Sequence, residues 1–381
     1  MDTASFTQGA WGELTRTLDG DPAFVPFPAP RTLELSAGAI GLLDEASHGL
    51  GLLAGIGRRL PNPHLLIAPY LRREAVLSSR IEGTQTSLSD VYASEADQLS
   101  LIAAPDVAEV RNYVSAYEHG LERLATLPLS IRFLQELHER LLAGVRGGVR
   151  PGRLRTSQNW IGGATARDAV YVPPPGEQMR ERLDDLERFL HERTLPPLVQ
   201  AGVIHCQFEA IHPFDDGNGR VGRLLVLLFL ADRGLLPQPL LYLSAFFERT
   251  RGAYYDGLLR VSTHGDWDSW LRYFLEGVRA QAHESAELGE RLLGLQSRYR
   301  ELLQRDRATA NAFALVDKLF ENPIVSAATV ARQLGVSAPT ARATIRALEE
   351  RGILREITGR RWGMVFRAEE IFDVLQGSEG A

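Results

Sequence analysis

The sequence predicts a mainly α-helical protein that ends in a small winged-helix domain. Apolar residues recur at spacings of three and four through most of residues 36–305, which is the period of a helix with one buried face. From residue 310 onward, two short capped helices precede two short β-like runs around a Gly-Arg-Arg turn, an order typical of a winged helix-turn-helix. Residues 144–175 are rich in Gly, Arg and Pro and predict loops around a β-hairpin.

The elements of the first half have their own start and stop signals. The Pro-rich residues 21–30 predict an extended arm before the first helix. The helix that starts at Pro105 has acidic residues in its first turn, where they suit the helix dipole. The β-like runs 157–161 and 169–172 flank a Gly-Gly turn and predict the hairpin. Helices are expected at residues 36–59, 64–80, 105–124 and 131–142.

The second half predicts further helices, a connector and the terminal domain. Ser326 and Ser337 are expected to cap the two helices of the terminal domain, which end near Gly335 and Gly352. Helices are also expected at residues 176–193, 198–210, 219–233 and 266–280, a charged connector helix at 281–305, and terminal strands at 353–357 and 362–366.

Composition excludes several function classes. The 381 residues contain 42 basic and 48 acidic side chains, so the net charge is −6, without the basic excess of a nucleic-acid-binding chain. The one lysine, Lys318, is followed by Leu319, which excludes a Walker phosphate loop and a kinase-type strand lysine. The single Cys206 excludes an intrachain disulfide and a Cys-rich zinc site. The longest fully apolar run, residues 224–231, is too short for a membrane span, and no leader is evident, so we expect a cytoplasmic protein.

The most informative stretch is His-Pro-Phe-Asp-Asp-Gly-Asn-Gly-Arg-Val-Gly-Arg at residues 212–223. A helix ends before it and an apolar helix begins after its Gly-Asn-Gly turn, so backbone N–H groups at that helix start form an anion site. Arg220 and Arg223 are three residues apart and share a helix face toward the anion. Asp216 suits Mg²⁺, which keeps phosphate ligands, and His212 is a titratable base. Together these groups indicate chemistry on a nucleotide phosphate.

Plainer explanations of this stretch are weaker. A solvated turn between two helices would explain any two of these residues but not the complete string. An EF-hand calcium loop needs alternating oxygen ligands and a closing Glu, which the stretch lacks. His205 and His212 are seven residues apart on a helix, about 10 Å of rise, which is too far for a shared zinc ion.

The stretch resembles the motif of the Fic family, His-x-Phe-x-Asp/Glu-Gly-Asn-Gly-Arg-x-x-Arg, at every fixed position. Residues 205–211 are typical of the helix that leads into that motif, and residues 153–175 resemble the family's flap hairpin. Residues 241–244 and 254–255 resemble its following helices. In all, residues 31–278 are similar to the family, and the winged helix is a common appendage. The resemblance implies a Fic-type helical bundle with a β-hairpin flap.

The resemblance implies a protein adenylyltransferase, which moves AMP from ATP onto a Ser, Thr or Tyr hydroxyl of a protein and releases pyrophosphate. His212 would deprotonate the hydroxyl, and Asp216 would hold Mg²⁺ on the phosphates. Because His212 must be neutral, activity is expected to fall below its ordinary pKa of about 6.5. Phe214 would fix the loop, and nucleotide contacts are further implied for Asp216, Gly217, Asn218 and Gly219 around the α-phosphate, for Arg220 and Arg223 on the β- and γ-phosphates, and for Tyr254 and Tyr255 at the adenine.

Core packing is the alternative for at least one of the two tyrosines, Tyr254 and Tyr255. Cys206 beside His205 is expected to be inert packing rather than a nucleophile.

An inhibitory segment is implied at residues 78–83, where Ser78-Ser79-Arg80-Ile81-Glu82-Gly83 fits the family pattern Ser/Thr-x-x-x-Glu-Gly/Asn. The plainer explanation is a helix end, with Ser78 and Glu82 on one face and Gly83 just after it. The segment precedes the motif, as in the branch of the family that has an in-chain brake. Glu82 would then pair with Arg223 and take the place of the γ-phosphate.

The expected partners are proteins. A target segment would add to the exposed strand edge of the flap and present its hydroxyl, although an ordinary surface hairpin is the alternative. The protein itself is an expected second target, and a homodimer stays open. Transfer of another group or removal of AMP also stays open, since a Glu such as Glu82 can position water, while Gly219 favours AMP.

The winged-helix domain is electrically neutral, with nine basic and nine acidic residues in 310–381. Arg342, Arg346, Arg360 and Arg361 could form a local stripe for DNA, although a neutral domain gains little counterion release, and a protein-contact role is the alternative. A DNA-binding regulator with a nucleotide-sensing Fic-like module is the alternative to an enzyme, but no catalytic position is replaced. We divide the chain into an N-terminal region with the inhibitory motif (1–104), a Fic catalytic core (105–280), a connector (281–309) and the winged helix-turn-helix (310–381).

Overall fold

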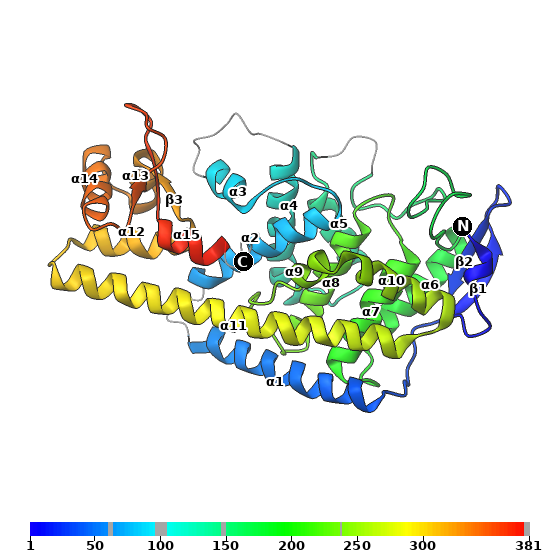
Figure 1. Cartoon of the computed structure of the whole chain (residues 1–381). Coiled ribbons are helices and arrows are strands. Elements are labelled where there is room, and N and C mark those ends of the chain that lie inside the picture. The colour runs from blue at the N-terminus through cyan, green and yellow to red at the C-terminus, as the bar shows by residue number, and fades with distance from the viewer. Residues whose placement is uncertain (60–63, 96–104, 146–149, 237, 377–381) are drawn as a thin grey trace.

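The computed structural model describes residues 1–59, 64–95, 105–145, 150–236 and 238–376, and it is mainly α-helical, as predicted (Figure 1). The helices are α1 (Ala37–Arg59), α2 (His64–Ile81), α3 (Leu88–Glu95), α4 (Pro105–Leu124), α5 (Ile131–Leu141), α6 (Gly176–His191), α7 (Pro197–Ile211), α8 (Asn218–Asp232), α9 (Ser244–Arg249), α10 (Arg251–His264), α11 (Trp267–Arg305), α12 (Ala310–Glu321), α13 (Ala327–Leu334), α14 (Ala338–Glu349) and α15 (Glu369–Gln376). The strands are β1 (Gly12–Arg16), β2 (Pro22–Pro26), β3 (Ile324–Ser326), β4 (Arg355–Glu356) and β5 (Val365–Arg367).

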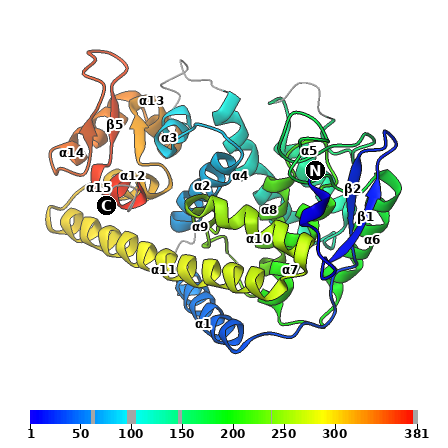
Figure 2. The same cartoon turned by 45° about the vertical axis from the view of Figure 1, so that its right-hand side comes forward.

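Two buried helices form the centre of the fold. Almost every residue of α7 and of α8 is buried, which is the pattern of a helix covered on all sides. α7 packs against α8 and contacts α6, α10 and α11, while α8 contacts α2, α4 and α5 (Figure 2). The turn between α7 and α8 carries the motif, so both ends of the motif are anchored in the core.

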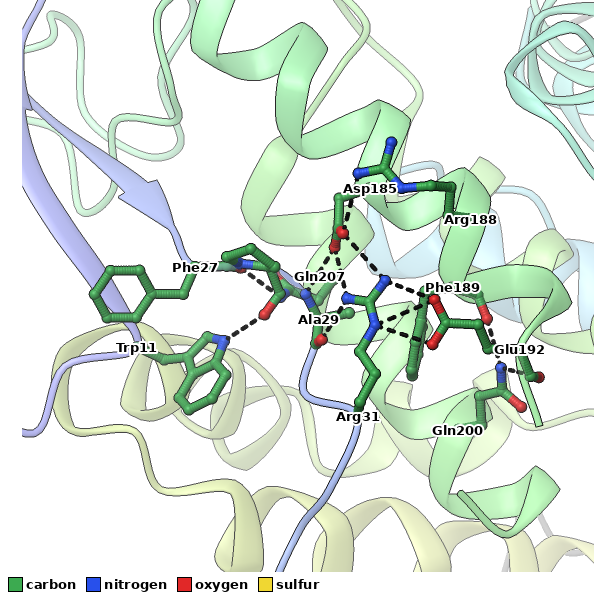
Figure 3. Close-up of polar contacts among 11 residues, drawn as sticks. Trp11, Phe27, Ala29, Arg31, Asp185, Arg188, Phe189, Glu192, Gln200 and Gln207 are labelled. Atoms are coloured by element: carbon green, nitrogen blue, oxygen red, sulfur yellow. Dashed lines mark hydrogen bonds and ion pairs between the residues drawn. The ribbon is translucent and has the colours of Figure 1, made fainter. Parts of the chain in front are cut away.

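A polar clamp holds the N-terminal arm against α6 and α7. β1 and β2 form an antiparallel hairpin, whereas the sequence predicted only an extended arm there. After β2, the Phe27 carbonyl accepts a hydrogen bond of 2.9 Å from Gln207 Nε2. Arg31 then pairs with Asp185 and Glu192, each at 2.9 Å (Figure 3). Because Gln207 lies on α7 shortly before the motif, the clamp also steadies the helix that leads into it.

α11 is one continuous helix of 39 residues. The sequence predicted two helices, at 266–280 and 281–305, but the buried face continues through the expected junction at Gln281 and Ala282. α1 lies alongside α11, and α12 and α15 contact it further on (Figure 1). The boundary predicted after residue 280 therefore falls inside a helix that joins the core to the terminal domain.

The terminal domain has the predicted helix-turn-helix and wing. Ser326 caps α13 and Ser337 caps α14, and Gly335 ends α13 in the left-handed conformation, with φ 64°. β4 and β5 are shorter than the two predicted strands, and with β3, which the sequence did not predict, they form a sheet in the order β3-β5-β4. α12 packs on α2, so the domain lies against the helix that carries the inhibitory segment. Among the described residues, no helix combines the length and apolar character needed to cross a membrane.

Candidate active site

His212 lies at the sharp end of α7. Its backbone is left-handed, with φ 48° and ψ 62°, a conformation that costs a non-glycine residue on the order of 1 kcal/mol or more. Arg155 Nε donates a hydrogen bond of 2.9 Å to the His212 carbonyl and holds this conformation. The His212 Nδ1 lies 3.3 Å from the Glu209 carbonyl, which can only accept, so Nδ1 carries the proton and Nε2 keeps a lone pair. Burial lowers the pKa of His212 to about 4, so the ring is neutral at pH 7.

The turn after His212 is fixed by reciprocal bonds. The Phe214 N–H donates to Asn218 Oδ1, and Asn218 Nδ2 donates back to the Phe214 carbonyl, both at 2.9 Å. The buried Phe214 ring stacks on His138, with centroids 3.9 Å apart. The Gly152 N–H donates to His138 Nδ1, so His138 Nε2 carries the proton that is donated to the Asp216 carbonyl at 3.0 Å. His138 therefore ties α5 to the motif.

The first turn of α8 presents the anion site. Gly217 precedes it with φ 77°, a left-handed conformation that favours glycine. No side chain of the described residues caps this helix start, which leaves its N–H groups for an anion. Asp216 is half-buried, and its Oδ1 accepts a hydrogen bond of 2.6 Å from the Gly217 N–H.

Asp216 fits Mg²⁺ only together with a substrate. Within the described part of the chain, no three His, Cys, Asp or Glu side chains gather as a metal cluster. Mg²⁺ is commonly held by one or two carboxylates together with substrate phosphates and waters. A single carboxylate at the edge of an anion site has this donor chemistry, so Asp216 would hold Mg²⁺ when a nucleotide supplies the remaining oxygens.

Arg223 is buried and engaged by the C-terminal turn of α2. Its Nε donates to Ser78 Oγ at 2.8 Å, and its Nη2 donates to the Ser78 carbonyl at 2.9 Å and to Glu82 Oε1 at 2.7 Å. Burial alone would raise the pKa of Glu82, but the Arg223 guanidinium outweighs it and lowers that pKa, so Glu82 is ionised at neutral pH. A Cβ on Gly219 would lie 2.3 Å from Glu82 Oε1, so only glycine there leaves room for this carboxylate. Gly83 follows α2 with φ 96°.

Arg220 has different surroundings from Arg223. Its guanidinium is fully buried, and its Nη1 forms an ion pair of 2.8 Å with Glu109 of α4. Thr84, just after the inhibitory segment, also donates to Glu109, at 3.3 Å. Arg223 lines the pocket and Arg220 is not among the residues that line it. The contact of each arginine with the nucleotide phosphates stays a prediction.

A pocket of about 650 Å³ opens beside these groups. Tyr254 and Tyr255 both line it but differ in exposure. Tyr254 is buried among aromatic rings, and its hydroxyl lies 2.8 Å from His205 Nε2, whereas Tyr255 is 40% exposed. Cys206 is buried at the wall, and burial raises the pKa of its thiol, which agrees with inert packing. The pocket is lined by Glu82, Trp160, Ile161, Gly162, Val170, Tyr171, Cys206, Glu209, Ala210, His212, Gly219, Arg223, Arg251, Tyr254, Tyr255, Asp256, Leu258, Leu259 and Ser262.

The flap folds back on itself but is not a regular hairpin. The predicted strands at 157–161 and 169–172 are absent, and one β-bridge joins Ile161 to Tyr171. A side-chain bond replaces the ladder: Asn159 Nδ2 donates to the Phe214 carbonyl at 2.9 Å and so ties the flap to the motif. Gly162 turns the chain with φ 72°.

Several site residues carry no recognisable sequence signal. No motif position assigns a role to Arg155, His138, Glu109 or Glu209, because each acts through a contact with a distant segment or through burial. Arg155 and His138 hold the motif backbone from 57 and 78 residues away.

Family comparisons agree with this geometry. Residues 40–122 match the N-terminal region of the Fic/DOC family, and residues 128–230, which include all of the motif, match the Fic/DOC family domain. The chain therefore carries a Fic/DOC family domain. Residues 313–368 of this Fic protein match a helix-turn-helix DNA-binding domain, which covers most of the winged helix.

Curated relatives of this Fic protein are named protein adenylyltransferases. It is 34% identical to protein adenylyltransferase fic-1 of Caenorhabditis elegans over 148 residues, which are 38% of this chain and 26% of that protein. It is 30% identical to protein adenylyltransferase Fic of Drosophila yakuba over 153 residues, which are 39% of this chain and 28% of that protein. The chain thus spans about a quarter of the length of these relatives.

Solved structures share the fold. A Fic family protein from Desulfovibrio desulfuricans aligns over 88% of this Fic protein and 97% of its own chain, with a TM-score of 0.58 and 22% identity. A fragment of Fic-1 from C. elegans aligns over 68% of this chain and 73% of its own, with a TM-score of 0.50 and 24% identity.

Proposed function

We propose that this Fic protein transfers AMP from ATP to a Ser, Thr or Tyr hydroxyl of a protein. The observation that carries the proposal is the grouping, around one pocket, of a neutral His212, an open helix start and the buried Arg223. The names of the curated relatives support the same reaction class. Nothing in the motif is replaced that the reaction would need.

The reaction is an in-line displacement at the α-phosphorus. His212 Nε2 takes the proton of the target hydroxyl as its oxygen bonds to that phosphorus. The bond from the α-phosphorus to the bridging oxygen breaks, and pyrophosphate leaves with the electron pair. The N–H groups of the α8 start, at Asn218 and Gly219, stabilise the charge that develops on the α-phosphate. Arg223 holds the terminal phosphates by its guanidinium fork, and Tyr255 borders the adenine end.

We assign Mg²⁺ to Asp216. When bound, the metal neutralises phosphate charge and orients the leaving pyrophosphate. Asp216 is kept in place by the Gly217 N–H, and its main chain by His138. Phe214 and Asn218 fix the turn that carries this carboxylate, so its position depends on the same contacts as the histidine.

We further propose that α2 acts as a brake. Glu82 occupies the Arg223 guanidinium and the space above Gly219, where a terminal phosphate would bind. A charge-assisted bond of this kind is worth about 1.5–3 kcal/mol. ATP must displace it to reach the productive pose, so we expect weak activity of the wild-type protein, seen as self-modification.

We propose that target proteins dock along the flap. Trp160 and Val170 are 41% and 58% exposed and line the same pocket as His212, so a bound segment would meet them as its hydroxyl enters. A homodimer and a cytoplasmic location are also proposed, the latter because a single cysteine suits a reducing compartment.

The terminal domain favours a second function, DNA binding. It matches a helix-turn-helix DNA-binding domain, and Arg342, Arg346, Arg360 and Arg361 are exposed on α14 and the wing. We propose that these arginines contact DNA phosphates while the Fic core carries the transfer reaction.

The position of the label in ATP tests the transfer reaction. Protein with Glu82→Gly should become labelled from ATP carrying ³²P at the α-phosphate and not from ATP carrying it at the γ-phosphate. Label from the γ-phosphate would instead indicate phosphate transfer and would contradict the proposal.

A further inference from the structure

Glu209 is an acid of the pocket that the proposed mechanism leaves unused. It lies on α7, three residues before His212, and it lines the pocket together with Arg223. Its Oε1 is buried, and within the described part of the chain it has no hydrogen-bond partner. A buried polar oxygen without a partner costs on the order of 1–3 kcal/mol, so its persistence in a binding pocket points to a ligand that satisfies it.

Two glycines of α8 leave space for acidic side chains, one for Glu82 of the brake and one for Glu209. A Cβ on Gly219 would lie 2.3 Å from Glu82 Oε1, and a Cβ on Gly222 would lie 2.4 Å from Glu209 Oε1. The two glycines are three residues apart and therefore on one face of the helix. Glu82 and Glu209 thus lie against neighbouring positions of the same α8 face.

We propose that Glu209 is a further nucleotide-contacting residue, which donates a hydrogen bond from its neutral carboxyl group to an oxygen of the bound nucleotide. The inference rests on the nucleotide binding proposed above and adds a donor beside the brake. A carboxylate would repel the phosphates, whereas a carboxylic acid supplies an O–H donor.

The surroundings of Glu209 favour this neutral form. Burial raises its pKa to about 8, Arg223 lowers it and the nearby Glu82 raises it. Phosphate charge would raise it further, in the same sense as Glu82. The pKa values of His205 and His212 are lowered to about 3 and about 4, so neither ring titrates between pH 7 and 9. Burial also raises the pKa values of Cys206, Tyr254 and Tyr255, which keeps them protonated there.

ATP affinity as a function of pH tests the proposal. Calorimetric titration with ATP would use protein with Glu82→Gly, so that the brake does not compete. The affinity should weaken about tenfold between pH 7 and 9 as Glu209 loses its proton. Adding Glu209→Gln keeps a donor that cannot ionise, so the affinity should stay within about threefold of the pH 7 value across this range. Adding Glu209→Ala should weaken binding about three- to tenfold at pH 7 and also remove the pH dependence.

The matched control is Glu181→Gln on α6, the same chemical change at a side chain 60% exposed outside the pocket. It should leave the pH dependence intact, and thermal melting confirms that each variant is folded. Equal pH dependence with and without Glu209→Gln, or a parent affinity that does not change with pH, would overturn the inference while leaving ATP binding in place. Loss of ATP binding in the parent would overturn the proposed function itself.

Discussion

The neutral state of His212 changes the pH range in which the enzyme should work. From its ordinary pKa of about 6.5, a histidine base would be roughly 90% protonated at pH 5.5. Burial lowers the pKa of His212 to about 4, so the folded protein keeps the neutral base, which is lost only as the pH falls through about 4. With Glu82→Gly and saturating ATP and Mg²⁺, the rate at pH 5.5 should be within about twofold of the rate at pH 7.5. A tenfold loss of rate at pH 5.5 would indicate that His212 keeps its ordinary pKa and would contradict this prediction.

Removing the base should separate binding from chemistry. His212→Ala in the Glu82→Gly protein should abolish transfer while ATP still binds, because the phosphate contacts come from α8 rather than the imidazole. Initial rates and calorimetric titration measure the two effects, and His191→Ala at the exposed end of α6 serves as the control. Transfer within tenfold of the parent would show that another group acts as the base.

The two adjacent aspartates offer a paired test of the metal site. Asp216→Ala should lose Mg²⁺-dependent transfer, and raised Mg²⁺ should recover little, because no second carboxylate is assigned to the ion. Asp215→Ala should keep most activity, since Asp215 pairs with Arg150 at 3.4 Å. Rates over a Mg²⁺ titration distinguish the two variants. Equal transfer activity in Mg²⁺ and in chelator would show that the reaction does not need the metal and would contradict this assignment.

The motif residues could be predicted because they are contiguous, whereas their supports could not. The spacing within residues 212–223 alone indicates a base, an anion site and an arginine. That Arg155 holds the His212 carbonyl and Glu109 holds Arg220 depends on which distant segments meet. No local spacing encodes such contacts. For the same reason, the sequence placed Arg220 at the phosphates and the structure pairs it with Glu109.

The α2 helix is the element on which regulation depends. Glu82→Gly should raise self-modification about ten- to a hundredfold, because a charge-assisted contact of about 1.5–3 kcal/mol no longer competes for Arg223. Glu82→Gln should activate less if a hydrogen bond to Arg223 persists. Adding Arg223→Ala to Glu82→Gly should return activity toward the wild-type level, since the freed partner is gone. Incorporation of α-labelled ATP measures all four proteins, and a Glu82→Gly protein no more active than wild type would reduce the segment to a helix end.

The junction of α4 and α8 should matter for stability. Arg220→Ala leaves Glu109 as a buried charge without its ion-pair partner and should lower the free energy of unfolding by about 3–5 kcal/mol. The double change Arg220→Met with Glu109→Leu removes both charges and should recover most of this loss. Urea denaturation measures both effects. An unchanged unfolding midpoint for Arg220→Ala would show that the pair contributes little.

Elements with strong periodicity and caps could be predicted, and elements made by distant partners could not. The caps at Ser326 and Ser337 and the helix start at Pro105 lie where the sequence places them. β2 is a Pro-bounded segment that becomes a strand because β1 pairs with it. The flap lacks its predicted strands, and the Gln158 amide binds its backbone instead, by donating to the Asn159 and Pro173 carbonyls.

The whole molecule joins two functional units through α11, and the terminal unit can be tested separately. Binding of a DNA duplex by the full chain should weaken with salt, by about 0.9 in the logarithmic slope for each phosphate contacted. Arg360→Ala should reduce that slope by about one, while transfer activity stays unchanged. A fluorescence titration over a salt series measures the slope. DNA binding that changes neither with salt nor with Arg360→Ala would favour a protein partner for this domain.

Mass spectrometry of the protein after incubation with ATP and Mg²⁺ tests the account most directly. The Glu82→Gly protein should gain one AMP group on a Ser, Thr or Tyr side chain, and the Glu82→Gly, His212→Ala protein should gain none. An adduct of phosphate or of another group, an AMP adduct that persists without His212, or no adduct on the protein or on added lysate proteins would contradict it.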